Sequence, residues 1–229
     1  MKSFWISAPA IVFVACQGNT QDKIELKTQK DTVSYSIGTD IGKNLKAQSI
    51  EINAQALAHG IADAIAGKKM LLTDQQIQDA MARFQKELAA KTQEKASAMA
   101  EKNNKDGKAF LLANKAKEGV KTTASGLQFK VIKEGTGPKP RKDQHVTVHF
   151  RATLVDGTEF DNSYKRGEPL TFSLGSVIPG WIEGLQLMSV GSKYVLYIPV
   201  DLGYGDRGMG AAVPPGSTLI LEVELLSIQ

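Results

Sequence analysis

The sequence predicts an α+β protein with a helical N-terminal region, a long connecting helix, and an antiparallel β-sheet wrapped on one short helix. Apolar residues recur at every fourth position across much of residues 31–90, which is typical of amphipathic helices. No proline occurs from Thr73 to Gly137, so the last of these helices can run on. From about Val120 the apolar residues alternate instead, which is typical of half-buried strands. The chain therefore divides into a helical part and a sheet part.

The helical part, residues 31–90, is expected to be a dimerisation domain. Each expected helix has a residue that can cap its first turn. The candidate caps are Asp31 or Thr32, then Asn53, then Thr73 with Gln76. The apolar stripes are Val33, Ile37, Ile41 and Leu45; Leu57, Ile61 and Ile65; and Ile77, Met81, Phe84 and Leu88. A domain of about 60 residues buries little surface alone, so a homodimer is expected, although the stripes could instead pack on one another within one chain.

Residues 91–119 are expected to extend the third helix as a polar connecting arm. The apolar stripe thins out after Leu88, and residues 91–108 are mostly Lys, Glu, Gln, Asn and Ala. A helix of about 40 residues is roughly 60 Å long, and its second half has too few apolar residues to bury a face. The alternative is a helix that frays into a loop near Asn103 and Asn104.

The first residues have the pattern of an export signal. Lys2 precedes an apolar run over residues 4–14 that is too short to span a bilayer as a helix. We expect a signal peptide at residues 1–15, followed by a polar tether at residues 16–30.

The chain has one cysteine, Cys16, which follows a small residue at the end of this apolar run, as in bacterial lipoprotein cleavage sites. Lipidation of Cys16 is therefore expected, and the protein would contact a membrane only through that lipid anchor. Phe13 departs from the leucine that is usual three residues before such a cysteine. The alternatives are cleavage nearby by an ordinary signal peptidase, which leaves a free soluble protein, and a buried inert thiol.

Composition and motif content exclude several kinds of function. A net charge of +4, with equal numbers of basic and acidic residues from residue 120 onward, does not suggest a nucleic-acid surface. The chain has no G-x-S-x-G motif and no P-loop, so covalent catalysis is not expected. His145 and His149 fall on one strand face roughly 13 Å apart, too far to share a metal, and are expected to be polar surface positions. Neither a metal site nor a cofactor is expected.

The sheet part, residues 120–229, is expected to be a separate domain. Alternating segments predict strands at Leu127 to Val131, Val146 to Ala152, Lys193 to Pro199 and Thr218 to Leu226. Asp156-Gly157, which lies between apolar residues, indicates a hairpin turn. A short helix from Trp181 to Met188 is expected to cover the inner face of the sheet.

Aromatic and branched apolar residues of this domain occur beside turns, where such residues are uncommon. The clusters are Phe160-Asp161-Asn162-Ser163, Val177-Ile178-Pro179-Gly180-Trp181, Leu202-Gly203-Tyr204-Gly205-Asp206 and Val213-Pro214-Pro215-Gly216. Each has a purely structural explanation when taken alone: Trp181 could be core, Tyr204 could anchor a loop, and Asp161 could be an ion partner of Arg166.

Together these clusters resemble a known family. The ordered set is Gly157-x-x-Phe160-Asp161-x-Ser163, Val177-Ile178-x-Gly180-Trp181-x-Glu183-Gly184, Tyr204-Gly205 and Pro214-Pro215-x-x-x-Leu219. This set is similar to that of FKBP-type peptidyl-prolyl cis-trans isomerases, and it covers essentially all of residues 120–229. Tyr35-Ser36-Ile37-Gly38-x-x-Ile41-Gly42 with the long polar arm extends the resemblance to the exported Mip/FkpA-like group of bacterial isomerases. The resemblance implies an FKBP-like sheet, a V-shaped dimer, unfolded or proline-containing polypeptide clients, and a location in the periplasm or outer membrane of a Gram-negative bacterium.

The resemblance also implies roles for individual residues. Trp181 would form the floor under the substrate's proline ring, and the Ile178 N–H and the Tyr204 hydroxyl would hold substrate carbonyls. The implied catalytic residues are Asp161 and Tyr204, and the implied substrate-binding residues are Phe150, Phe160, Arg166, Val177, Ile178, Trp181, Val213 and Leu221.

The chain departs from the family pattern at several positions around this pocket. Phe150 replaces a common Tyr, Leu170 and Leu221 stand where many members have Phe, and Met209 occupies a position where some have His. These changes predict a wider pocket. Macrolide inhibitors are implied ligands, but the changes leave macrolide affinity open.

Two other functions fit the same sequence. One is a holdase chaperone that acts mainly through the helical domain, and the other is a surface factor that binds a host protein. The isomerase hypothesis needs no nucleophile, because an apolar pocket removes the solvation that stabilises the polar planar amide and so lowers the barrier to its rotation.

Overall fold

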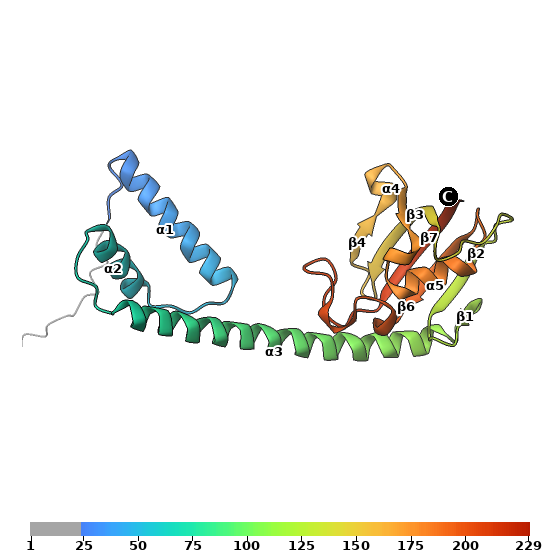
Figure 1. Cartoon of the computed structure of the whole chain (residues 1–229), viewed down its shortest axis with the longest axis horizontal. Coiled ribbons are helices and arrows are strands. Elements are labelled where there is room, and N and C mark those ends of the chain that lie inside the picture. Colours follow the sequence, from blue (N-terminus) through green and yellow to red (C-terminus); the bar gives the residue numbers. More distant parts are fainter. Residues whose placement is uncertain (1–23) are drawn as a thin grey trace, which may run out of the picture. The chain divides into compact units, whose positions relative to one another are not determined.

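The structure, a computed structural model, describes residues 24–229 (Figure 1). The predicted signal peptide, the first part of the predicted tether and Cys16 lie outside the described residues. The chain divides into two compact units, with the boundary between Thr73 and Asp74. Among residues 24–229, no helix combines the length and the apolar character needed to cross a bilayer.

The first unit contains helices α1 (Gln29–Ala47) and α2 (Ala54–Ile65). Helix α1 begins earlier than predicted, because Thr28 is its cap: the Thr28 side chain accepts a hydrogen bond from the Asp31 N–H, and the Asp31 carboxylate accepts one from the Thr28 N–H. Asp31 is therefore the third helical residue of a capping box and not the cap. Asn53 caps α2 as predicted, since its side chain accepts a hydrogen bond from the Ala56 N–H at 3.0 Å.

The apolar stripes of this unit are largely exposed. Helix α1 has no buried residue, and the one buried residue of α2 is Asp63. The exposed large apolar side chains of the two helices are Val33, Tyr35, Ile37, Leu57, Ile61 and Ile65. Monomeric proteins seldom expose so much apolar surface over so short a segment, so the packing of these stripes within the chain is incomplete.

Helix α3 (Asp74–Asn114) is continuous over 41 residues, so the predicted long helix is confirmed and the frayed alternative is wrong. At 1.5 Å per residue it is about 60 Å long. Asn103 and Asn104 both lie inside it, because no proline or glycine precedes Gly107 to interrupt the backbone hydrogen bonds.

The second half of α3 is not the free spacer that its polar composition predicts. It packs beside the sheet unit (Figure 1) and buries Ala100, Gly107 and Asn114. The Asn114 side-chain amide donates to the Gln128 side chain at 3.0 Å, and Gln128 donates in turn to the Leu111 carbonyl at 2.8 Å. Small residues that pack closely and side-chain amides that form hydrogen bonds hold this half of α3 against the sheet. It therefore needs no apolar stripe.

The sheet contains seven antiparallel strands in the order β1-β2-β6-β7-β3-β4, with β5 paired to β3. Their bounds are β1 Val120–Thr122, β2 Gln128–Lys133, β3 His145–Leu154, β4 Glu159–Asn162, β5 Leu170–Ser173, β6 Lys193–Ile198 and β7 Leu219–Ile228. The four predicted strands correspond to β2, β3, β6 and β7. The short edge strands β1, β4 and β5 were not predicted, because segments of three or four residues are too short to show alternation. The predicted Asp156-Gly157 turn joins β3 to β4, and Gly157 adopts a φ of 88°.

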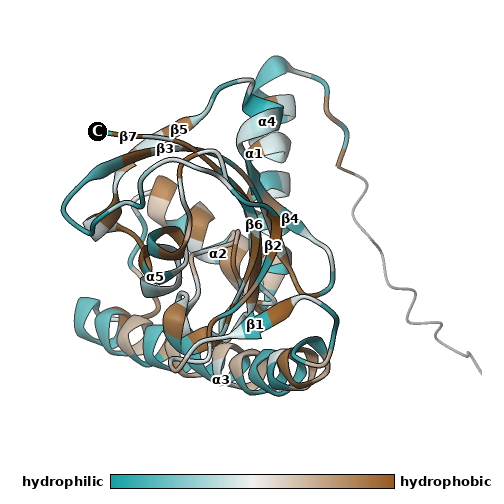
Figure 2. Cartoon of the chain, turned by 90° about the vertical axis from the view of Figure 1, so that its right-hand side faces the viewer, coloured by the Kyte–Doolittle hydropathy of each residue, from teal (hydrophilic) through white to brown (hydrophobic). Residues whose placement is uncertain are grey.

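The sheet curves around helix α5 (Pro179–Leu187), as Figures 1 and 2 show. Helix α5 begins two residues before the predicted start, with Pro179 in its first turn, where a missing N–H has no cost. The fully buried side chains between α5 and the inner face of the sheet form the core, including Leu127, Val146, Val148, Leu185, Leu196, Leu221 and Val223. The predicted α+β class, with an antiparallel sheet on a short helix, is confirmed.

Candidate active site

A cavity of about 320 Å³ opens at one end of α5, between that helix, the inner face of the sheet and the loops after β6. Its wall is mainly apolar. The lining residues are Phe150, Ala152, Phe160, Asp161, Leu170, Phe172, Ser176, Val177, Ile178, Trp181, Tyr204, Met209, Leu219 and Leu221. A wall of this kind suits an apolar group of a ligand, with polar atoms needed only at the rim.

Trp181 lines the cavity and is contacted by two aromatic rings. Phe150 and Phe172 each meet the indole edge to face, with ring centroids 5.2 Å away in both cases. Helix α5 approaches β6 closely because it carries glycine at two positions one turn apart: a Cβ on Gly180 would overlap Ile198, and one on Gly184 would overlap Leu196. The sequence of α5 therefore sets the depth at which the indole lies.

Asp161 lies on the cavity wall at the end of β4, where helix α4 (Ser163–Arg166) begins. Its carboxylate accepts hydrogen bonds from the Asn162 N–H and from the guanidinium of Arg166. The Arg166 guanidinium also lies over the Phe150 ring, 5.5 Å from its centroid. Both partners of the ion pair are about 40% exposed, so a polar edge borders the apolar cavity.

Two hydrogen-bond donors at the cavity have no partner within the described chain. The Tyr204 hydroxyl makes no hydrogen bond to residues 24–229, and burial raises its pKa, with the charge of Asp161 adding to this effect. The Ile178 N–H likewise donates to no group of the described residues, although the Ile178 carbonyl accepts from the Trp181 N–H at 3.0 Å. Both donors are available to a ligand's carbonyl groups.

The cavity brings together most of the residues that the sequence indicated. Eight of them line it: Phe150, Phe160, Asp161, Val177, Ile178, Trp181, Tyr204 and Leu221. Arg166 does not line it but pairs with Asp161 at its edge. Val213, predicted as a wall residue, does not line the cavity; it is fully buried and forms a β-bridge with Met209 within the loop after β6.

Four lining residues were missed. Ala152, Phe172 and Leu219 each lie at even spacing from a residue already assigned to the inner face of their strand or its neighbour, so the alternation could have found them. Ser176 has no such signal, because it lies in the 3₁₀ turn before α5.

His149 is not the simple surface position that was predicted. Its ring stacks on Tyr164 with centroids 4.6 Å apart, and its Nδ1 lies 3.0 Å from the Ser163 hydroxyl. The same hydroxyl, which is fully buried, donates to the Phe150 carbonyl and accepts from the Phe150 N–H. In the described part of the chain no cluster of three His, Cys, Asp or Glu side chains could hold a metal ion.

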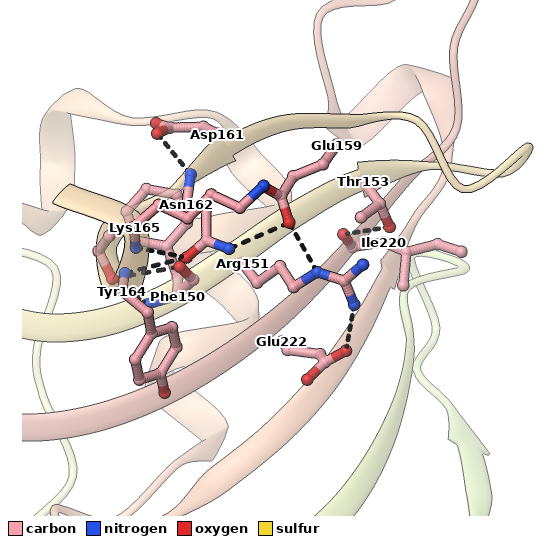
Figure 3. Close-up of polar contacts among 11 residues, drawn as sticks. Phe150, Arg151, Thr153, Glu159, Asp161, Asn162, Tyr164, Lys165, Ile220 and Glu222 are labelled. Carbon is pink, nitrogen blue, oxygen red and sulfur yellow. Dashed lines mark hydrogen bonds and ion pairs between the residues drawn. The ribbon is translucent and has the colours of Figure 1, made fainter. Parts of the chain in front are cut away.

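The β4–α4 segment that carries Asp161 is fastened by polar contacts on the outer face of the sheet (Figure 3). Glu159 accepts hydrogen bonds from Lys165, Arg151 and Asn162, and the Asn162 side chain also caps α4. These contacts lower the pKa of Glu159 from 4.5 to about 2, and the hydrogen bond from Lys165 makes the largest contribution. The position of Asp161 thus depends on a charged cluster outside the cavity.

This cluster predicts a pH dependence of stability. Because the folded-state pKa of Glu159 is lower than its unfolded value, its contribution is complete above about pH 4.5 and is lost as the pH falls from 4.5 toward 2. The difference in unfolding free energy between the wild type and Glu159→Gln should therefore shrink over that range in urea titrations. A difference that stays constant down to pH 2 would contradict the assignment.

A curved antiparallel sheet closed by one helix, with an indole in the wall of an apolar cavity and two donors that have no partner among the described residues, defines a site suited to an apolar ring flanked by carbonyl groups. Comparison with known proteins identifies such a family. Residues 137–226 match the family described as "FKBP-type peptidyl-prolyl cis-trans isomerase", and residues 30–131 match the "domain amino terminal to FKBP-type peptidyl-prolyl isomerase".

Relatives match most of the chain. The "Outer membrane protein MIP" of Legionella longbeachae is 47% identical over 208 residues, which cover 91% of this chain and 89% of that protein. The "FKBP-type 22 kDa peptidyl-prolyl cis-trans isomerase" of Escherichia coli K12 is 45% identical, with 85% and 93% coverage. The crystal structure of FkpA from Escherichia coli matches with a TM-score of 0.71 at 37% identity, over 90% of this chain and 99% of that one. The chain belongs to the FKBP-type peptidyl-prolyl cis-trans isomerase family.

Proposed function

We propose that the cavity floored by Trp181 catalyses rotation about X–Pro peptide bonds in polypeptide clients. The observation that carries this proposal is the pairing of a deep apolar cavity with two free donors, the Tyr204 hydroxyl and the Ile178 N–H. Rotation about an amide has a barrier of about 18–20 kcal/mol, because the planar form is stabilised by charge separation between N and O. Water favours that planar form, so transfer of the bond into the cavity weakens the planar state more than the twisted one.

Each part of the cavity has a distinct role in this mechanism. Trp181 contacts the flat face of the proline ring, and the aromatic walls exclude water. Tyr204 and Ile178 donate to the carbonyls on either side of the bond and hold its flanks while it turns. The pair of Asp161 and Arg166 orients the substrate at the rim through its partial charges, without transferring a proton.

The experiment is an isomerase assay of the wild type on a proline-containing peptide, with Tyr204→Phe as the test variant. We expect Tyr204→Phe to lower kcat/KM about three- to tenfold, the effect of one lost hydrogen bond. Tyr164→Phe is the matched control, because the Tyr164 hydroxyl bonds to Glu224 on the outer face of the sheet and should leave kcat/KM unchanged. An inactive wild type would refute the function, and equal rates for wild type and Tyr204→Phe would refute the role of the hydroxyl.

The proposal extends to assembly. A groove of about 610 Å³ between α1 and α2, lined by Ile41, Leu45, Leu57 and Ile61 among others, supports a homodimer in which a second copy covers the exposed stripes. A dimer would present two cavities to one client and so raise their effective concentration.

We expect a solution mass twice that of one chain by sedimentation equilibrium, and a monomer from Ile61→Asp. A monomeric wild type would contradict the dimer.

The proposed location is the periplasm or the outer membrane of a Gram-negative bacterium, reached through a signal peptide and a lipid on Cys16. The apolar run before Cys16 and the name of the Legionella relative, "Outer membrane protein MIP", support this location. Mass spectrometry of the mature N-terminus tests this: a diacylglyceryl-cysteine start is expected, and cleavage elsewhere would contradict the anchor.

Macrolide inhibitors are the proposed small-molecule ligands of the cavity lined by Trp181.

A further inference from the structure

The second half of α3 lies against the loop that supplies one side of the cavity. This loop, residues 203–218, lies between the 3₁₀ turn Val200–Leu202 that follows β6 and strand β7. It carries Tyr204 and Met209, and Leu219 of the cavity wall follows it directly. In Figure 1 the loop rests on α3, and the 3₁₀ turn Gly205–Arg207 contacts the helix. The contact is made by one face of α3.

Three α3 residues form this face: Ala100, Asn103 and Gly107, at helical spacing. A Cβ added to Gly107 would overlap the side chain of Thr218, and one added to Gly216 would overlap the backbone of Ala100. The helix and the loop therefore approach each other closely, with backbone against backbone at Ala100 and Gly216.

Asn103 supplies the directional contact of this face. Its side-chain amide donates to the Pro215 carbonyl at 2.9 Å, and the bond is partly buried. The next residue, Gly216, donates its N–H to the Gly205 carbonyl at 3.1 Å. Gly205 follows Tyr204 directly, so one hydrogen bond links the loop residues held by α3 to the residue next to the tyrosine.

We propose that Asn103 is a positioning residue for catalysis, which places the Tyr204 hydroxyl at the cavity by anchoring the Pro215–Gly216 peptide to α3. This inference rests on the proposed isomerase function. Asn103 does not line the cavity and, among the described residues, forms no hydrogen bond to a residue that does, so its effect passes through the Gly216–Gly205 hydrogen bond. Helix α3 is on this view part of the catalytic unit as well as a connector.

The test is a double-mutant cycle in the full-length chain. Asn103→Asp keeps the size of the side chain but removes the donor to Pro215, and Asn104→Asp makes the same change of charge one residue away, where the described chain offers no hydrogen-bond partner. We expect Asn103→Asp to lower kcat/KM about fivefold, mainly through kcat, while Asn104→Asp changes it less than about twofold. In a Tyr204→Phe background the effect of Asn103→Asp should nearly disappear, because both variants remove the same interaction.

The outcomes separate the two claims. An inactive wild type refutes the proposed function. With an active wild type, the positioning role is overturned if Asn103→Asp and Asn104→Asp have equal rates, or if the effects of Asn103→Asp and Tyr204→Phe multiply. Thermal unfolding of each variant is measured alongside. If Asn103 had a purely structural role, Asn103→Asp would lower Tm, and its effect on the rate of the folded protein would be the same with and without the Tyr204 hydroxyl.

Discussion

Replacement of Trp181 by leucine is expected to lower kcat/KM for a proline-containing peptide by at least about tenfold, equivalent to roughly 1.4 kcal/mol of lost transition-state stabilisation. The indole is the inner wall of the cavity, and it is held edge to face by Phe150 and Phe172. A leucine removes the edge-to-face contact of both rings and opens space beneath the proline ring. Water that enters this space restores the solvation of the planar amide, which is the state that catalysis must disfavour.

The same substitution is expected to reduce stability by about 2 kcal/mol, so the loss of activity needs a control for unfolding. Leu225→Ala is suitable, because Leu225 is fully buried in β7 but does not line the cavity. It should cost about 2–5 kcal/mol and leave kcat/KM unchanged at temperatures where the variant is folded. If Trp181→Leu retained the wild-type rate, the cavity would not be the active site.

Gly184→Ala is expected to have the second largest effect, on both stability and activity. The added methyl would overlap the side chain of Leu196 on β6, which is fully buried and cannot move into solvent. Overpacking of this kind costs about 1–3 kcal/mol, of which the better helix propensity of alanine offsets up to about 1 kcal/mol. Because Trp181 lies one turn earlier on α5, displacement of the helix should also lower kcat/KM several-fold.

A second substitution tests the cause of this loss. Leu196→Val removes the methyl groups that meet the new Cβ, so Gly184→Ala/Leu196→Val should be more stable than the sum of the two single effects predicts. Part of the isomerase activity should return with it. The free energies of unfolding are measured by urea denaturation. If the effects of the two substitutions were strictly additive, the cost of Gly184→Ala would not come from overlap with Leu196.

Residues of the site that are marked by a local sequence pattern could be predicted, and contacts between distant segments could not. Trp181, Tyr204 and Asp161 stand out in the sequence because they adjoin turns, where glycine and proline spacing places them in relation to one another. Phe172 and Leu219 do not adjoin such turns, but the alternation of a strand puts both on the inner face of the sheet and could have identified them. The contact between Asn103 and Pro215 was not, because it joins residues 112 positions apart through one side-chain amide.

The sequence alone determined the α+β class, the order of the three N-terminal helices, the four longer strands and α5, the continuity of α3 and the identity of most cavity residues, because these follow from local periods, caps and turn residues. Only the tertiary structure decided that the polar half of α3 packs on the sheet, that Val213 is fully buried and does not line the cavity, and that the Tyr204 hydroxyl has no partner among residues 24–229. The physical reason is that close backbone approach at Gly107 and Gly216, and single amide hydrogen bonds, carry no hydrophobic pattern along the chain. Such contacts exist only once distant segments are brought together.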